Sequence, residues 1–198
     1  MKRIFLLGPI LFATLVTTLT IIKYDFLLSI GWHPLADPTF DWPSGLALGK
    51  YGFMMTAAFI ISGLLIALLA LRLKADLKPA LTSQAGSTLL ALSGLALASL
   101  AFTTDPTIRT TPATWHGILH DLSFVLLGLT LFPSMLILGF AFRQNESWKM
   151  FSFYTWLTVA FAIPAFIIKG AAFYVFLFLV LLWNEIIAWR LNKAGEGK

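Results

Sequence analysis

The sequence predicts an all-α membrane protein: a polytopic helical bundle of six transmembrane helices with both termini in the cytoplasm. Two features of composition indicate a membrane protein. Of the 198 residues, 59% are hydrophobic and only 12% are charged, and the mean hydropathy is +0.86, whereas about a quarter of the residues of a soluble protein are charged. The third feature is a series of apolar runs about as long as the roughly 20 residues that an α-helix needs to cross a bilayer.

We expect one transmembrane domain covering residues 1–198, with helices at about 4–22, 51–73, 85–102, 116–142, 151–168 and 171–189. The first run is longer than the apolar part of a signal peptide, about 7–15 residues, and lacks a small-residue cleavage site, so we expect a retained helix. Only Lys169 and Gly170 separate the last two runs, which predicts a tight helical hairpin.

Two of these helices have compositions that predict their place in the bundle. The helix at 85–102 is rich in Gly, Ala and Ser, and small side chains allow close helix packing in lipid. We therefore expect it at the centre of the bundle. The helix at 171–189 contains a bulky apolar series, AAFYVFLFLVLLW, which favours a position facing lipid.

The distribution of positive charge predicts the orientation. If the N-terminus lies inside, ten of the 14 Lys and Arg residues fall on the cytoplasmic side and four on the other, as expected from retention of positive residues in the cytoplasm. We therefore expect a multi-pass protein of the plasma membrane in contact with membrane lipids. The net charge of +5 lies at helix ends, so we expect no nucleic-acid partner. The chain has no Cys, which excludes disulfides and thiolate metal sites.

Polar residues collect at one predicted face, the outer one. His116 and His120 open the fourth helix at positions i and i+4, which places them on one face. A first outer loop, residues 29–45, contains His33, Asp37 and three prolines among aromatic residues that we expect at the membrane interface. We expect this loop to form a cap over the mouth of the bundle.

These residues predict a metal site. His116 and His120 would bind zinc together with His33 or Asp105, because zinc takes nitrogen and oxygen ligands and can activate a bound water. Asp121, rotated about 100° from His120 on the helix, or Asp37 would take the proton from that water. The sequence thus suggests a zinc-dependent hydrolase of a lipid amide or ester.

Two other interpretations stay open. The same pocket would serve a non-enzymatic protein that binds or transports a lipid headgroup or small ligand, and a chain of this length would then act as a homodimer or by simple gating. Alternatively, both histidines bond to loop carbonyls or lipid phosphates at the membrane surface and hold no metal. Haem binding is disfavoured because His116 and His120 share one face.

Several short motifs resemble an uncharacterised integral-membrane family of bacteria and archaea, domain of unknown function 998. They are Asp37-Pro38, Ser44 with Tyr51-Gly52, Phe102-Thr103-Thr104-Asp105, and His116-Gly117-Ile118-Leu119-His120. The similarity covers about 25–185 and implies a compact multi-span fold without an assigned activity. This chain has Gly45-Leu46 where an acidic residue is expected after the serine.

A looser likeness is to the alkaline ceramidases, whose zinc site combines histidines, an aspartate and a serine at the mouth of a helical bundle. That likeness implies a place for Ser44 in the site, beside Asp105 and the paired histidines.

Overall fold

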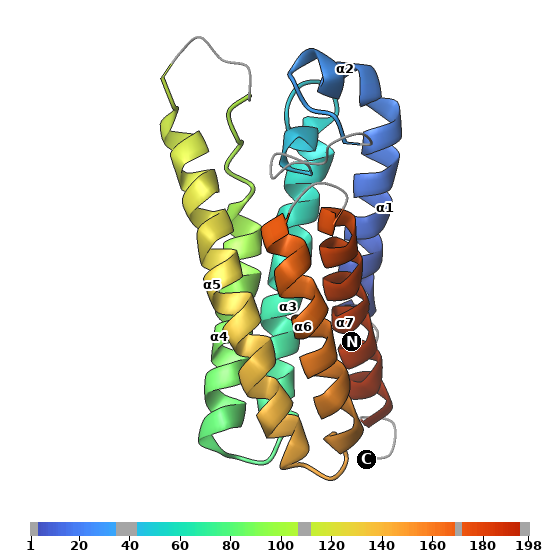
Figure 1. Cartoon of the computed structure of the whole chain (residues 1–198), viewed down its shortest axis with the longest axis vertical. Coiled ribbons are helices and arrows are strands. Elements are labelled where there is room, and N and C mark those ends of the chain that lie inside the picture. Colours follow the sequence, from blue (N-terminus) through green and yellow to red (C-terminus); the bar gives the residue numbers. More distant parts are fainter. Residues whose placement is uncertain (1–3, 35–42, 107–111, 169–171, 195–198) are drawn as a thin grey trace.

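The structure is a computed structural model that describes residues 4–34, 43–106, 112–168 and 172–194. Within this part of the chain, six helices are long and apolar enough to cross a membrane (Figure 1). The prediction of an all-α bundle with six such helices is confirmed. Its orientation in the membrane stays a prediction.

The long helices are α1 (Leu7–Ile22, preceded by the 3-10 turn η1, Ile4–Leu6), α3 (Gly52–Asp76), α4 (Leu81–Ser99), α5 (Trp115–Arg143), α6 (Lys149–Ile168) and α7 (Ala172–Ala194). Two short elements were not expected, α2 (Tyr24–Ser29) and the 3-10 turn η2 (Ser44–Ala47). The start of α4 also lies earlier than expected. Here the Ser83 hydroxyl accepts a hydrogen bond from the Ala80 amide at 3.0 Å, which caps the helix. The short elements both lie between the first two long helices.

The six long helices form a ring. Each packs against the next in chain order, and α7 also packs against α1 and α3 (Figure 1). We call the end where α4 joins α5 the histidine end, at the top of Figure 1, and the opposite end the termini end. An even number of passes places Ile4 and Ala194 on the same side of the bundle.

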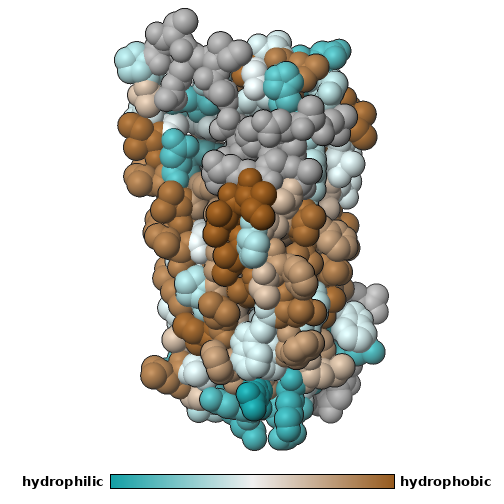
Figure 2. Space-filling view, in the orientation of Figure 1, coloured by the Kyte–Doolittle hydropathy of each residue, from teal (hydrophilic) through white to brown (hydrophobic). Residues whose placement is uncertain are grey.

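The outer surface of the ring is apolar. Figure 2 shows a hydrophobic belt around the middle of the visible face, with hydrophilic residues at both ends. Large apolar side chains such as Phe53, Leu129 and Phe178 are more than half exposed. A belt of this extent suits the hydrocarbon layer of a bilayer.

Two glycines bring α3 and α4 into backbone contact. A Cβ atom on Gly94 would lie 2.6 Å from the Ala67 amide nitrogen, and one on Gly63 would lie 2.4 Å from the Gly94 carbonyl oxygen. The small residues of α4 therefore do allow close packing. The expected central position of this helix is wrong, however, because α4 packs chiefly against α3 and α5, at one side of the ring.

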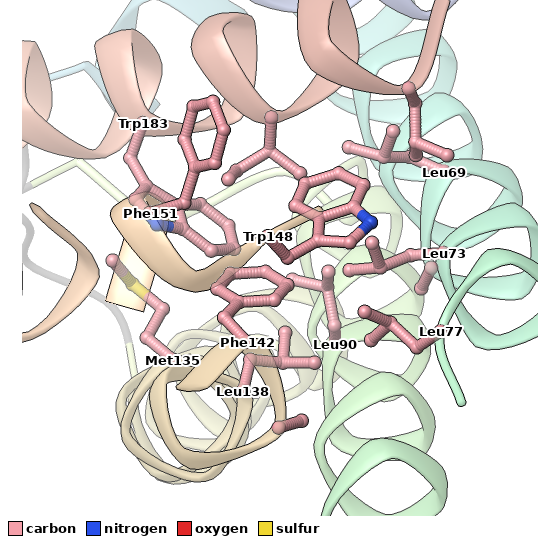
Figure 3. Packing of buried hydrophobic residues seen from close by; sticks show 14 of the residues in the cluster. Leu69, Leu73, Leu77, Leu90, Met135, Leu138, Phe142, Trp148, Phe151 and Trp183 are labelled. Atoms are coloured by element: carbon pink, nitrogen blue, oxygen red, sulfur yellow. The ribbon is translucent and has the colours of Figure 1, made fainter. Parts of the chain in front are cut away.

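Aromatic packing closes the termini end (Figure 3). The Trp148 ring, in the turn between α5 and α6, stacks on Phe142 with ring centroids 5.0 Å apart. Its indole N–H donates to Asp76 at the end of α3, at 3.0 Å, and the Arg190 guanidinium of α7 lies 5.1 Å from the ring centroid. One tryptophan thus joins α3, α5 and α7.

A substitution pair tests the α3–α4 contact. Gly94→Ala should lower the melting temperature in detergent by roughly 2–12 °C, because overpacking costs about 1–3 kcal/mol. Gly128→Ala is the control, since a Cβ there would lie 3.7 Å from Phe166, an ordinary contact. It should be neutral or slightly stabilising, because Ala favours a helix over Gly. Equal melting temperatures for both variants would contradict this packing.

Candidate functional site

Helix α5 begins at Trp115, with Thr114 as its N-cap. The Thr114 hydroxyl oxygen accepts a hydrogen bond from the Gly117 amide at 3.1 Å. The first-turn amides of a helix have no partner within the helix, and this bond supplies one for Gly117. The helix was expected to begin within a residue of this point, at 116.

The Asp105 carboxylate fastens the connection after α4 to this cap. It accepts hydrogen bonds from the Thr114 amide at 2.9 Å and from the Thr114 hydroxyl at 2.7 Å. A Cβ atom on Gly117 would lie 2.3 Å from the carboxylate, so only glycine allows this approach. The negative charge at the start of α5 also interacts favourably with the helix dipole.

His116 is held by the same connection. Its Nδ1 lies 2.7 Å from the Thr103 carbonyl oxygen and 3.0 Å from the Thr114 hydroxyl. Because a carbonyl oxygen can only accept, Nδ1 carries the proton. In the neutral ring, Nε2 then has the free lone pair.

His120 lies one turn deeper and is buried, with 3% of its surface exposed. Its Nδ1 donates to the carbonyl oxygens of Phe102 at 2.7 Å and of Leu100 at 3.1 Å. Its Nε2 lies 2.8 Å from Oγ of Ser44. The two carbonyls fix the proton on Nδ1, so the neutral ring accepts a hydrogen bond from the Ser44 hydroxyl.

Ser44 opens η2, whose position depends on Trp32. The Trp32 side chain is 1% exposed and covers Gly45, where a Cβ atom would lie 0.9 Å from the ring. Trp32, expected among the interfacial aromatic residues, has its ring inside the protein, where it fills the space that Gly45 leaves. Its depth in the membrane stays a prediction. Gly45 stands where the family pattern suggested an acidic side chain, which would not fit here.

A buried lysine also positions η2. The Lys23 ammonium donates to the Leu46 carbonyl oxygen at 2.7 Å and to that of Leu48, and it lies 5.1 Å from the centroid of the Phe26 ring. Burial lowers the pKa of Lys23 from its usual value of 10.5. The sequence analysis missed this residue, because a single cation directly after an apolar run is typical of a membrane anchor.

A cavity lies in the middle of the ring. Ser44 and Pro43 line it at the histidine end, and Asn184 of α7 lines it toward the termini end. Most of its wall is apolar and comes from α1, α3, α4, α5 and α7, with Phe12, Phe59, Leu97, Leu100, Phe124, Leu127, Leu131, Phe173, Phe176 and Leu177 among its residues. The last helix was expected to face lipid, and side chains such as Phe178 are indeed exposed. A different face of α7 forms a wall of this cavity.

Of the other predicted site residues, Asp105 and His116 belong to the start of α5. His33 and Asp121 are exposed, and Asp37 lies outside the described residues. Within the residues that the structure describes, no three His, Cys, Asp or Glu side chains gather closely enough to hold a metal ion. Zinc therefore stays a prediction.

A comparison with known protein families shows the family of this chain. A family model described as Protein of unknown function (DUF998) matches residues 13–191, which is nearly the whole chain. The chain belongs to this family. The resemblance drawn from its short motifs is confirmed, and this DUF998 protein is a multi-pass membrane protein by its six apolar helices.

No curated protein and no solved structure matches the DUF998 chain. The likeness to alkaline ceramidases thus remains an analogy. The function has to be inferred from the geometry of Ser44, His120 and the cavity.

Removing the α5 cap tests the role of Thr114. Thr114→Val should lower the free energy of unfolding by about 0.5–2 kcal/mol, the usual cost of losing an N-cap, and also breaks the bond to Asp105. Thr17→Val, at an exposed position of α1, is the control. Thermal unfolding of both variants in detergent measures the difference, and equal stability of the two would refute the cap's contribution.

The buried lysine predicts a pH dependence. Because its pKa is lowered in the folded protein, the folded state releases a proton that the unfolded chain still holds at pH values just below 10.5. Stability should therefore rise with pH across that range. Lys23→Met should remove this rise, whereas Lys50→Met, at an exposed position, should keep it. Melting temperatures measured at a series of pH values give the comparison.

Proposed function

We propose that this DUF998 protein is a serine-dependent membrane hydrolase that cleaves an ester or amide of a lipid whose chain lies in the central cavity. The observation that carries the proposal is the 2.8 Å contact between Ser44 Oγ and His120 Nε2. A nucleophile within hydrogen-bond reach of a base, with the base oriented by a further group, is the arrangement that activates a serine.

Ser44 and His120 would be the catalytic residues. Ser44 Oγ attacks the carbonyl carbon of the lipid while its proton passes to His120 Nε2. The protonated His120 then gives this proton to the oxygen or nitrogen of the leaving group as the carbon–heteroatom bond breaks, leaving an acyl group on Ser44. Water, losing a proton to His120, attacks the acyl carbon, and the proton returns to Ser44 Oγ as the acid is released.

The carbonyls of Phe102 and Leu100 take the place that a carboxylate has in a Ser-His-Asp triad. They hold the imidazole with Nε2 toward Ser44, and their negative ends stabilise the imidazolium that forms during the reaction. The Phe59 ring packs edge-on against His120, with centroids 6.4 Å apart, which limits rotation of the imidazole. Asp105, His116 and Thr114 act as positioning residues, because they fasten α5 to the connection that supplies these carbonyls.

The cavity favours a lipid as substrate. Its wall is mostly apolar and lies within the membrane-spanning part of the helices, where an acyl chain replaces lipid contacts at little cost. Ser44 belongs to this wall, so a chain bound in the cavity would lie against that residue.

The zinc-dependent hydrolase suggested by the sequence would use the same Nε2 atoms. Metal-bound histidines usually donate their other N–H to a carbonyl or carboxylate, and Nδ1 of both His116 and His120 does so. The serine mechanism is preferred because the Ser44 hydroxyl already lies on His120 Nε2. Sensitivity to a chelator separates the two mechanisms.

A fluorophosphonate probe tests the nucleophile without knowledge of the substrate. The purified protein should be labelled on the peptide that contains Ser44, and Ser44→Ala should abolish the labelling. His120→Gln should slow it by about 10²–10⁴, the usual contribution of a general base. Ser29→Ala, which removes an exposed hydroxyl, is the matched control and should react like the wild type.

Two further results decide between the alternatives. Labelling should persist after dialysis against EDTA, and its loss on chelation with recovery on adding zinc would favour the metal mechanism. No labelling of a folded wild-type protein, judged by its melting temperature, would reject the serine mechanism and leave the zinc hydrolase and the binding or transport function.

A further inference from the structure

Three polar side chains line the cavity on its termini side, the end away from Ser44: Ser62, Ser93 and Asn184. Each donates a hydrogen bond to a backbone carbonyl. The Ser62 hydroxyl donates to Gly8 at 3.1 Å, the Ser93 hydroxyl to Leu90 at 2.8 Å, and one N–H of the Asn184 amide to Val180 at 3.0 Å. Both hydroxyl donors are thus engaged, and Asn184 keeps its carbonyl oxygen and its second N–H.

The Asn184 carbonyl oxygen, Oδ1, needs a donor. The side chain is 1% exposed, and within the described residues this oxygen has no hydrogen-bond partner. Its orientation is set by Val180, because a backbone carbonyl can bond only to the NH₂ group of the amide. An unpaired buried carbonyl is costly, so a ligand that supplies a donor here would be favoured.

The chemistry of the donor follows from the lining. No acidic side chain is among the described residues that line the cavity, so a buried ammonium would lack a counter-charge and bear the full cost of desolvation. A neutral hydroxyl meets no such cost. The remaining apolar wall is suited to the hydrocarbon on either side of that hydroxyl.

The position of Asn184 fixes where the hydroxyl must be. Phe173 and Asn184 both line the cavity from α7, and a rise of 1.5 Å per residue places them about 16 Å apart along the helix. The cavity lining thus extends about 16 Å along α7, and Ser44 belongs to the same lining. A hydroxyl near the chain's far end would reach Asn184.

We propose that Asn184 binds a hydroxyl group on the chain of the lipid, so that the substrate class is a long-chain ester or amide hydroxylated far from the cleaved bond. This inference rests on the proposed function for placing the cleaved bond at Ser44. The binding of the hydroxylated chain itself does not require catalysis.

Binding is best measured on the unreactive Ser44→Ala protein. The probes are methyl esters of ω-hydroxy fatty acids of increasing chain length, each paired with the unsubstituted ester and followed by native mass spectrometry in detergent. One hydroxylated length should bind roughly three- to tenfold tighter than its unsubstituted partner, the gain expected of one buried hydrogen bond. Adding Asn184→Leu, which has a similar size, should remove this preference.

Adding Ser134→Ala to the same background is the matched control. It removes a buried hydroxyl that bonds to the Gly86 carbonyl and is not among the cavity-lining residues, and it should keep the preference. Equal affinity for hydroxylated and unsubstituted esters at every length would overturn the inference and assign the Asn184 oxygen to a water molecule. Because the protein is already Ser44→Ala, this result is independent of whether the wild type reacts with fluorophosphonate.

Discussion

Backbone carbonyls that follow the end of a helix have no partner within it, and in an apolar surrounding they need another hydrogen-bond donor. The structure of the histidine end depends on the side chains that supply these donors. Helix α4 ends at Ser99, and the carbonyls of Leu100, Phe102 and Thr103 bond to the two histidines of α5. Lys23 bonds in the same way to carbonyls of the segment that begins with Ser44. In lipid, each of these carbonyls would cost several kcal/mol if it had no hydrogen-bond partner. The side chains that bond to the carbonyls therefore also fix the path of the connections.

The Ser44–His120 pair follows from this arrangement. A neutral histidine whose Nδ1–H donates a hydrogen bond to a carbonyl has its lone pair at Nε2. The chemistry of the site then depends on which group bonds to that lone pair. Here the η2 turn brings a hydroxyl to that position, held by Trp32 over Gly45 and by the carbonyl bonds of Lys23. The same interactions that stabilise two loops thus place a serine hydroxyl on the lone pair of a histidine, at the end of an apolar cavity.

The sequence predicted the six helices well because the bilayer requires runs of fixed length and low polarity, and both properties are local. The short motifs also sufficed to suggest the family. The likeness to the ceramidases suggested Ser44 and the paired histidines for one site. The direct contact of Ser44 with His120 could not be predicted from spacing, since 76 positions separate them and their contact depends on the path of a loop. The burial of Trp32 and Lys23 was not predicted for a similar reason: aromatic and basic residues at helix ends usually mark the membrane interface, and only tertiary packing shows that these two point inward.

The glycine contact between α3 and α4 has a mechanical consequence for the cavity. Where the backbones of α3 and α4 touch at Gly63 and Gly94, no side chains lie between them that could change conformation. These two helices therefore form a stiff wall. Helix α7 faces the same space with Phe173, Phe176 and Leu177, whose long side chains change rotamer without moving a backbone. We therefore expect the volume of the cavity to vary mainly along α7.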